Sequence, residues 1–306
     1  MTLGQIRTFL AVVRAGSVRG AAAALHISEP SVSAAVGALE RETGVALLER
    51  DGRGIRLSAA GEAFARYGAE AIGLLEQGTD AARGATRPGT GRLRLAAVTT
   101  AGEAIVPLLL QAFLQRFPGV EATLEVGNRA LVGQRLRERA ADVGIGGRPD
   151  RGLAGVEFLP NELVLVASSE HPLARRAHLT AEDLAGATWL LREAGSGTRA
   201  TAEEFLGSSG IEARTTLTMG SNGAIRQSAA IGLGITLIST HAVDHDLATG
   251  TLKRLKAPGL PLKRAWFALF PEAGTLPPAS QSFVRFLRSP DAKRALKNRS
   301  RAARSA

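Results

Sequence analysis

Apolar residues in the N-terminal part of the chain recur every three or four positions, the spacing that places them on one face of a helix. The pattern occurs in three runs, each preceded by a side chain that can cap a helix: Thr2, Ser17 and Ser28. The runs are Ile6, Phe9, Leu10 and Val13; Val18, Ala21, Ala22 and Leu25; and Val32, Val36 and Leu39. The sequence therefore predicts three short helices. A turn, His26–Ser28, joins the last two as in a helix-turn-helix, whose second helix enters the major groove of DNA.

The third predicted helix carries small and polar residues opposite its apolar stripe. Such a surface can approach DNA closely, because hydroxyls donate to phosphate oxygens and an alanine methyl packs on a thymine methyl. The candidate DNA-contacting residues from this pattern are Ser31, Ser33 and Ala34. The helix spacing fits an alanine-rich bundle without a role in DNA binding equally well.

Two short strands, Leu47–Arg50 and Gly54–Leu57, are predicted around the turn sequence Asp51-Gly52-Arg53. A hairpin at this position is the wing of a winged helix-turn-helix. Its tip would carry Arg53, and an arginine there can reach the minor groove, whose negative potential is strongest in narrow A·T tracts. Arg53 is therefore a further candidate DNA-contacting residue.

A long helix is predicted to begin at Ser58 and to end before the glycine-containing and proline-containing segment 84–91. Its apolar positions alternate steps of four and three residues, as in the seam of a coiled coil: Ala60, Phe64, Tyr67, Ala71, Leu74, Gly78 and Ala81. A single apolar seam is stable in water only when it packs against a second apolar surface. Pairing with a second copy would set two recognition helices side by side for a two-fold operator, and packing on its own domain is the alternative.

From Arg92 onward, short apolar strands alternate with helices, the pattern of parallel sheets. The expected strands include Leu93–Val98, Leu163–Ala167 and Trp266–Phe270, and a single apolar helix is expected over Ala101–Phe117. Two sets of such units predict two α/β lobes around a crevice. One lobe is expected to contain residues 91–162 with 267–290, and the other residues 163–266. Ligands of open α/β sheets bind at the carboxyl ends of the strands.

Polar residues at predicted strand ends and helix starts form a candidate anion site, because free backbone N–H groups there attract negative charge. The candidates are Thr99, Thr100 and Asn128 from the first lobe and Ser196, Gly197, Thr198 and Arg199 from the second. Ordinary helix capping is the alternative. The segment Gly195–Ala200 also fits a loose dinucleotide pattern, but the rest of that fold is missing and no cofactor is expected.

Composition narrows the possible classes of protein. The 306 residues carry a formal net charge of +10, 45% hydrophobic residues and no cysteine, which excludes a disulfide framework and a thiol nucleophile. No apolar run approaches the roughly 20 residues of a transmembrane helix, and the N-terminus lacks a signal-peptide pattern, so we expect a cytoplasmic protein. The segment 291–306 holds six basic residues and one acidic residue and is expected to be a frayed, solvated end.

An enzyme finds little support in the sequence. Ser196 lacks the glycine that a nucleophile elbow needs two positions earlier, and no Walker-type loop occurs. His241 and His245 stand one helical turn apart, but no third ligand has a fitting spacing, so no metal is expected. The alternative to a DNA-binding protein is an anion-binding enzyme or sensor that does not use DNA.

Residues 3–62 resemble the DNA-binding domain of LysR-type transcriptional regulators. The shared motifs are Phe9–Val13, Gly16–Val18, Ala22–Leu25, Ser28–Ser33, Leu39-Glu40, Gly44, Leu48–Arg50, Arg53 and Leu57–Gly61. The sequence departs from the family at Glu29, Leu48 and Ser58, where Gln, Phe and Thr are usual. Glu29 sets a carboxylate where the family's amide faces DNA, so the resemblance adds Glu29 to the candidate DNA-contacting residues. That carboxylate favours the helix dipole and can accept from a cytosine amino group, but it opposes phosphates.

The rest of the chain resembles the family's effector domain, which has the fold of periplasmic solute-binding proteins. Its motifs resemble the branch of regulators of carbon-dioxide fixation and sulfur assimilation, whose members respond to small anions or phosphorylated metabolites: Val98–Thr100, Gly127-Asn128, Glu162–Val166, Glu193–Arg199, Met219–Ile225 and Gly232–Gly234. The resemblance implies a homodimer or homotetramer that binds a double-stranded DNA operator under the control of a small anionic effector. The expected domains are a winged helix-turn-helix (1–58), a linker and dimerisation helix (59–90), a two-lobed α/β effector domain (91–290) and a basic tail (291–306).

Overall fold

The structure is a computed structural model that describes residues 1–52, 54–86 and 89–305. Its packing divides the chain into two units, one formed by Met1–Ala82 with Arg137–Ala140 and the other by the remaining residues. Among the described residues, none of the helices combines the length and the apolar character needed to cross a membrane.

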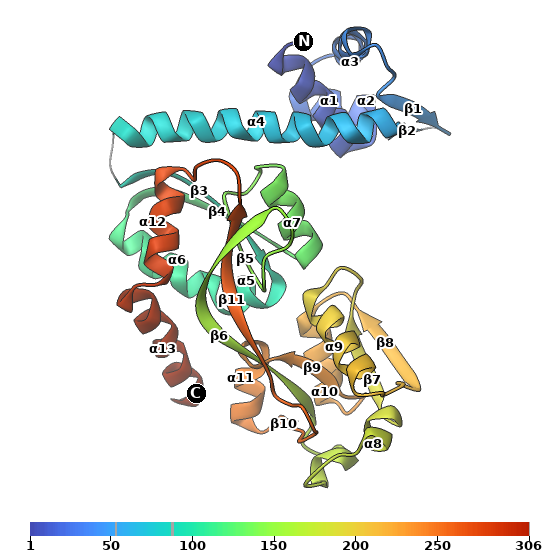
Figure 1. Ribbon diagram of the computed structural model, residues 1–306, viewed down its shortest axis with the longest axis vertical. Helices are drawn as coiled ribbons and strands as arrows, with labels where there is room; N and C mark the ends of the chain where they lie inside the picture. Colours follow the sequence, from blue (N-terminus) through green and yellow to red (C-terminus); the bar gives the residue numbers. More distant parts are fainter. Residues whose placement is uncertain (53, 87–88, 306) are drawn as a thin grey trace. The chain divides into compact units, whose positions relative to one another are not determined.

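Three short helices open the first unit: α1 (Leu3–Ala15), α2 (Val18–Leu25) and α3 (Glu29–Thr43) (Figure 1). Each begins directly after its predicted cap, whose side chain accepts a backbone N–H: Thr2, Ser17 and Ser28. The apolar stripes meet in one core, where Phe9, Val32 and Leu39 are fully buried. The predicted helix-turn-helix is confirmed.

A hairpin follows, in which β1 (Leu48–Asp51) pairs antiparallel with β2 (Gly54–Leu57). Arg53, the predicted wing-tip residue, lies outside the described residues. The long helix α4 (Ala59–Thr86) begins after Ser58, whose hydroxyl accepts from Gly61 N at 2.9 Å. Near its start, Phe64 packs edge-on against Phe9, with ring centroids 5.6 Å apart. These contacts anchor the N-terminal end of α4 to the helical core.

The second unit contains a seven-stranded sheet in the order β10-β6-β11-β5-β3-β4, with β9 also paired to β6, and a two-stranded sheet of β7 and β8. In the first lobe, β3 (Thr90–Val98) is parallel to β4 (Gly119–Gly127) and to β5 (Val143–Gly146). In the second lobe, β7 (Thr188–Arg192) is parallel to β8 (Thr215–Met219). The second lobe also contains β9 (Thr236–Ser239) and β10 (Leu252–Arg254). Parallel pairing was predicted for these βα units.

Two long strands, β6 (Leu153–Ser168) and β11 (Leu262–Pro271), run antiparallel to each other through both lobes (Figure 1). β9 and β10 also pair antiparallel with β6. The expectation of parallel sheets was therefore wrong for this part, because β11 returns along β6 in the opposite direction. The lobe boundaries expected at residues 162 and 266 fall inside these two strands.

Helices flank the strands of each lobe. Those of the first lobe are α5 (Thr99–Ala104), α6 (Val106–Arg116), α7 (Arg129–Arg137), α12 (Pro278–Leu287) and α13 (Pro290–Ser305). Those of the second are the 3₁₀ helix η1 (Pro172–Arg175), α8 (Ala181–Ala185), α9 (Gly197–Ser208), α10 (Asn222–Ala230) and α11 (Thr240–Thr249). Phe113 and Phe283 are fully buried in the core of the first lobe, and Trp189 in that of the second.

Two helix predictions were wrong. The single helix expected over Ala101–Phe117 is broken at Ile105 into α5 and α6, since Pro107 has no N–H for the preceding turn. The C-terminal segment, expected to be frayed, forms α13. Ala292 of this helix is buried in the core of the first lobe, and Asp291 pairs with Arg116 at 3.0 Å.

Candidate functional site

The recognition helix α3 presents the four predicted DNA-contacting residues. Its apolar stripe faces the core, and the side chains opposite are exposed: Glu29, Ser31, Ser33 and Ala34. The hydroxyls of Ser28 and Ser31 lie 2.8 Å apart. Glu29 is in the first turn, where the helix dipole favours a negative charge. The face that would meet DNA is therefore small, polar and uncovered within the first unit.

Glu40 joins this helix to the wing, a role that sequence reasoning missed. Its Oε1 accepts from the backbone N–H groups of Leu47 (2.8 Å) and Leu48 (3.1 Å), at the entrance to β1. Hydrogen bonds to a carboxylate are about twice as strong as those between neutral groups. The Leu39-Glu40 motif was visible in the sequence, but only the three-dimensional structure identifies the partners of the carboxylate.

A cleft of about 610 Å³ lies between the two lobes of the second unit. It is lined by all but one of the predicted anion-site residues: Thr99, Thr100, Asn128, Ser196, Gly197 and Thr198. These residues stand at the carboxyl ends of β3 and β4 and at the starts of α5, α7 and α9. The structure thus brings together residues that the sequence separates by about a hundred positions.

Two of the lining residues cap the helices that they precede. Asn128 Oδ1 accepts from Leu131 N at 3.0 Å in α7. Ser196 caps α9, and its Oγ accepts from Arg199 N at 3.5 Å. Ser196 is only 6% exposed. Its hydroxyl hydrogen has no acceptor among the described residues, so it can donate to a ligand in the cleft.

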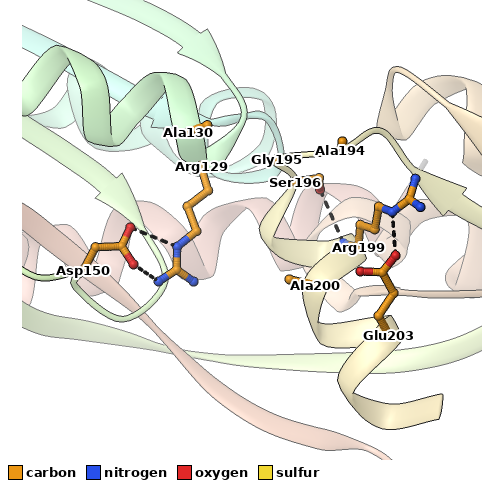
Figure 2. Close-up of a pocket in the computed structure, with 9 residues that line it drawn as sticks. All are labelled: Arg129, Ala130, Asp150, Ala194, Gly195, Ser196, Arg199, Ala200 and Glu203. Carbon is orange, nitrogen blue, oxygen red and sulfur yellow. Dashed lines mark hydrogen bonds and ion pairs between the residues drawn. The ribbon is translucent and has the colours of Figure 1, made fainter. Parts of the chain in front are cut away.

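Arg199, the remaining predicted residue, does not line this cleft. It lines a second pocket of about 550 Å³ beside the cleft (Figure 2). Arg199 Nε donates to Glu203 at 2.7 Å, and on the opposite side of the pocket Arg129 forms an ion pair with Asp150 (Figure 2). Both arginines therefore already have carboxylate partners.

Arg192, the last residue of β7, lines the cleft and was missed. It is 4% exposed. Its Nε and Nη2 donate to Glu193 (2.7 and 2.9 Å), Nη1 donates to Asn222, and Nη2 also donates to Thr99 (3.4 Å). A guanidinium has five N–H groups, so one on Nη1 has no acceptor among the described residues. A single arginine at the end of an apolar strand gives no periodic signal in the sequence.

Glu193 is the counter-ion of Arg192. Partial burial acts to raise the pKa of Glu193, but its hydrogen bond and charge interaction with Arg192 hold the pKa below the usual value. The pair is therefore ionised near neutral pH, and the buried guanidinium is neutralised in part before any ligand arrives.

The cleft lining as a whole is positively charged. It contains Arg129, Arg148, Arg192, Lys263 and Arg264 but only two acidic residues, Glu157 and Glu204. Among the residues that the structure describes, Arg148 and Lys263 form no ion pair. Positive charge in a concave site raises the local concentration of anions.

His241, one of the two histidines considered as a metal site, has another contact. In the described part of the chain, no three His, Asp or Glu side chains lie together as metal ligands would. His241 Nδ1 instead lies 3.4 Å from Trp266 Nε1, which donates to it in the cleft wall.

A winged helix-turn-helix combined with a two-lobed α/β unit around a cleft defines a ligand-controlled, DNA-binding transcriptional regulator. Residues 3–62 match the bacterial regulatory helix-turn-helix protein, lysR family, and residues 86–290 match the LysR substrate binding domain. The chain belongs to the LysR family of transcriptional regulators, and the predicted fold class is confirmed.

Similar proteins are named as transcriptional regulators, one of them of the RuBisCO operon. The chain is 35% identical to the RuBisCO operon transcriptional regulator of Acidithiobacillus ferrooxidans, covering 94% of this chain and 93% of that protein. It is 34% identical to the HTH-type transcriptional activator CmpR of Synechocystis, with 94% of each chain covered. These relatives are regulators, which favours a DNA-binding regulator over the enzyme alternative.

Two solved structures are also similar. The Synechocystis PCC6803 CcmR regulatory domain in complex with 2-PG is 34% identical, with a TM-score of 0.61, and the match covers 64% of this chain and 95% of that one. Full-length CbnR complexed with its target DNA is 24% identical with a TM-score of 0.65, covering 94% of this chain and 99% of that one. At 24% identity, the similarity to CbnR is evidence for the fold alone.

Proposed function

We propose that this regulator binds a small anionic effector in the cleft of its second unit, and that the effector alters how a homodimer or homotetramer engages an interrupted palindromic operator. The observation that carries the proposal is the convergence of hydrogen-bond donors from both lobes on one positively charged cleft. A ligand that contacts both lobes favours one of their relative arrangements over others.

The effector we propose is a small phosphorylated or comparable oxyanion. The donors are neutral and cationic: the hydroxyls of Thr100 and Ser196, the start of α9 at Gly197, and the guanidinium of Arg192. Charge-assisted hydrogen bonds of this kind contribute about 1.5 to 3 kcal/mol each. The complex of the CcmR regulatory domain with 2-PG, a 2-phosphoglycolate, supports a phosphorylated ligand in this chain as well.

For DNA binding we propose that α3 contacts the major groove through Glu29, Ser31, Ser33 and Ala34 and that Arg53 reaches the minor groove. The exposure of the four α3 residues supports this assignment. Glu29 is the residue expected to set operator preference, because a carboxylate accepts from cytosine and repels phosphates.

Self-association through α4 is the third part of the proposal. Tyr67, Leu74 and Leu75 are 74%, 43% and 50% exposed in the single chain. Large apolar side chains at helical spacing on one helix favour a second apolar surface as partner. Residues 59–90 would then link paired DNA-binding domains (1–58) to effector domains (91–290). The basic tail (291–306) would follow the effector domain, on which Ala292 at its start is packed.

The test is calorimetric titration of the full chain with phosphate, sulfate, sulfite, sugar phosphates and 2-phosphoglycolate. Thr100→Val and Ser196→Ala should each lower the affinity for the anion about tenfold, since a loss of 1.4 kcal/mol changes the dissociation constant by a factor of ten. Thr249→Val is the matched control, because the Thr249 hydroxyl bonds to His245 O at 3.0 Å at the end of α11, away from the cleft lining. Binding of none of these anions at millimolar concentration, or equal affinity in all variants, would contradict the proposal.

A further inference from the structure

Asn222 lies behind the cleft and connects its two sides. It is the first residue of α10, is 3% exposed and does not belong to the cleft lining. Its Oδ1 accepts from Nη1 of Arg192 in the same lobe, and its Nδ2 donates to Thr100 Oγ1 of the other lobe at 2.7 Å. One side-chain amide therefore holds a cleft residue of each lobe.

The bond from Asn222 determines which way the Thr100 hydroxyl can donate. A hydroxyl has one hydrogen and two acceptor lone pairs. Since Thr100 Oγ1 accepts from Asn222, its own hydrogen remains for another partner, and no acceptor for it occurs among the described residues. Thr100 is 5% exposed and lines the cleft, so the acceptor that fits is a ligand.

The neighbouring threonine has the opposite arrangement. Thr99 Oγ1 donates to the carbonyl oxygen of Gly127 at 3.1 Å and accepts from Arg192 Nη2 at 3.4 Å. Its hydrogen is already used, so an anion gains no donor from this hydroxyl. Of two adjacent threonines that look equivalent in the sequence, only Thr100 presents a donor to the cleft.

We propose that Asn222 is a positioning residue that makes Thr100 a hydrogen-bond donor to the effector and orients the Arg192 guanidinium beside it. This inference rests on the proposed binding of an anion in the cleft. An amide suits both tasks, because its nitrogen donates to a hydroxyl while its oxygen accepts from a guanidinium. The arrangement selects ligands that accept hydrogen bonds at this point, such as phosphate oxygens, and disfavours ligands that donate there.

Aspartate at position 222 would turn the Thr100 hydroxyl from an acceptor into a donor in its bond with residue 222. A carboxylate is acceptor-only, so Asn222→Asp keeps the bond from Arg192 but requires Thr100 to donate to it. The size of the side chain is unchanged while the Thr100 hydrogen is withdrawn from the cleft. This substitution therefore separates hydrogen-bond polarity from packing.

The test is a double-mutant cycle on the full chain, titrated with inorganic phosphate and with 2-phosphoglycolate. With Asn222 present, Thr100→Val should weaken binding about tenfold, the effect of one charge-assisted donor. In the Asn222→Asp background the same Thr100→Val substitution should cost less than about twofold, because the donor is already lost. Thr198→Val is the matched control: Thr198 lines the cleft without contacting Asn222, so its effect should be the same in both backgrounds.

Thermal unfolding checks that each variant folds. If Asn222→Asp is not folded at the assay temperature, Asn222→Ala takes its place. It leaves the Thr100 hydroxyl unoriented and without the cooperative bond, so the cost of Thr100→Val should fall to about threefold. An undiminished tenfold cost in the folded variant background would overturn the inference alone. Failure of the unsubstituted protein to bind either anion would overturn both the inference and the proposed effector class.

Discussion

The two candidate sites of this regulator are built in different ways. The proposed DNA-binding surface lies on one continuous segment, in which local periodicity and capping residues determine which side chains of α3 are exposed. The effector cleft is assembled from the ends of strands and starts of helices far apart in the chain, and its donors are oriented by buried polar partners. The first kind of site is specified by local sequence, and the second by long-range contacts that the sequence does not display.

Because of this difference, we expect a substitution that disrupts one site to leave ligand binding at the other unchanged. The largest loss of stability and operator affinity is expected from a core substitution in the first unit. Leu39 is completely buried in the helical core of α1 to α3, so Leu39→Ala should destabilise this unit by about 3 kcal/mol. Urea unfolding should then show a separate, early transition. Operator affinity should fall sharply while calorimetric titration of the cleft anion is unchanged. A parallel loss of anion binding would mean that the two units are not separable in this way.

A smaller loss of stability is expected when the hydrogen bonds between the recognition helix and the start of the wing are removed. Glu40→Ala removes the acceptor for the Leu47 and Leu48 N–H groups, at a cost of about 1 to 3 kcal/mol. Glu40→Gln keeps a carbonyl acceptor and serves as the matched control. Hydrogen exchange should accelerate at Leu47 and Leu48 in the alanine variant and much less in the glutamine variant, with operator affinity following the same order. Equal exchange in both variants would show that the carboxylate does not hold the wing.

The smallest effect concerns Glu29 at the start of α3. Its exposed carboxylate faces the side from which DNA is expected to approach. Glu29→Gln should therefore raise affinity for random-sequence DNA several-fold at low salt, with the gain shrinking as salt rises. Dependence on any cytosine that Glu29 contacts should weaken. Identical affinities across a salt series, measured by fluorescence anisotropy, would place Glu29 away from the duplex.

The same contrast explains what the sequence could predict. Capping residues and helical spacing identified α1 to α3, and the turn sequence Asp51-Gly52-Arg53 identified the hairpin, because those signals act within a few residues. Strand ends followed by polar residues identified six residues of the cleft lining, since strands in such a fold present their carboxyl ends to the ligand. The long strands β6 and β11 were only partly predicted, because Gly155 and Pro160 interrupt the apolar pattern of β6.

The predictions for the cleft failed in two ways. Arg199 was expected to line the cleft, but it pairs with Glu203 one helical turn later and lines the neighbouring pocket. Arg192 and Asn222 acquire their significance only when β7 and α10 meet α5, which brings both to Thr99 and Thr100. Residue type and spacing alone do not reveal which hydrogen bonds such side chains will make.

Genomic footprinting of the full-length protein, with and without 2-phosphoglycolate, tests the central claim most directly when wild type and Thr100→Val are compared side by side. Without ligand, both proteins should protect the same operators. The anion should change the extent or spacing of protection for wild type, whereas Thr100→Val should need about ten times more anion for the same change. A footprint that ignores the anion, or one that responds equally in both proteins, would contradict control of DNA binding through this cleft.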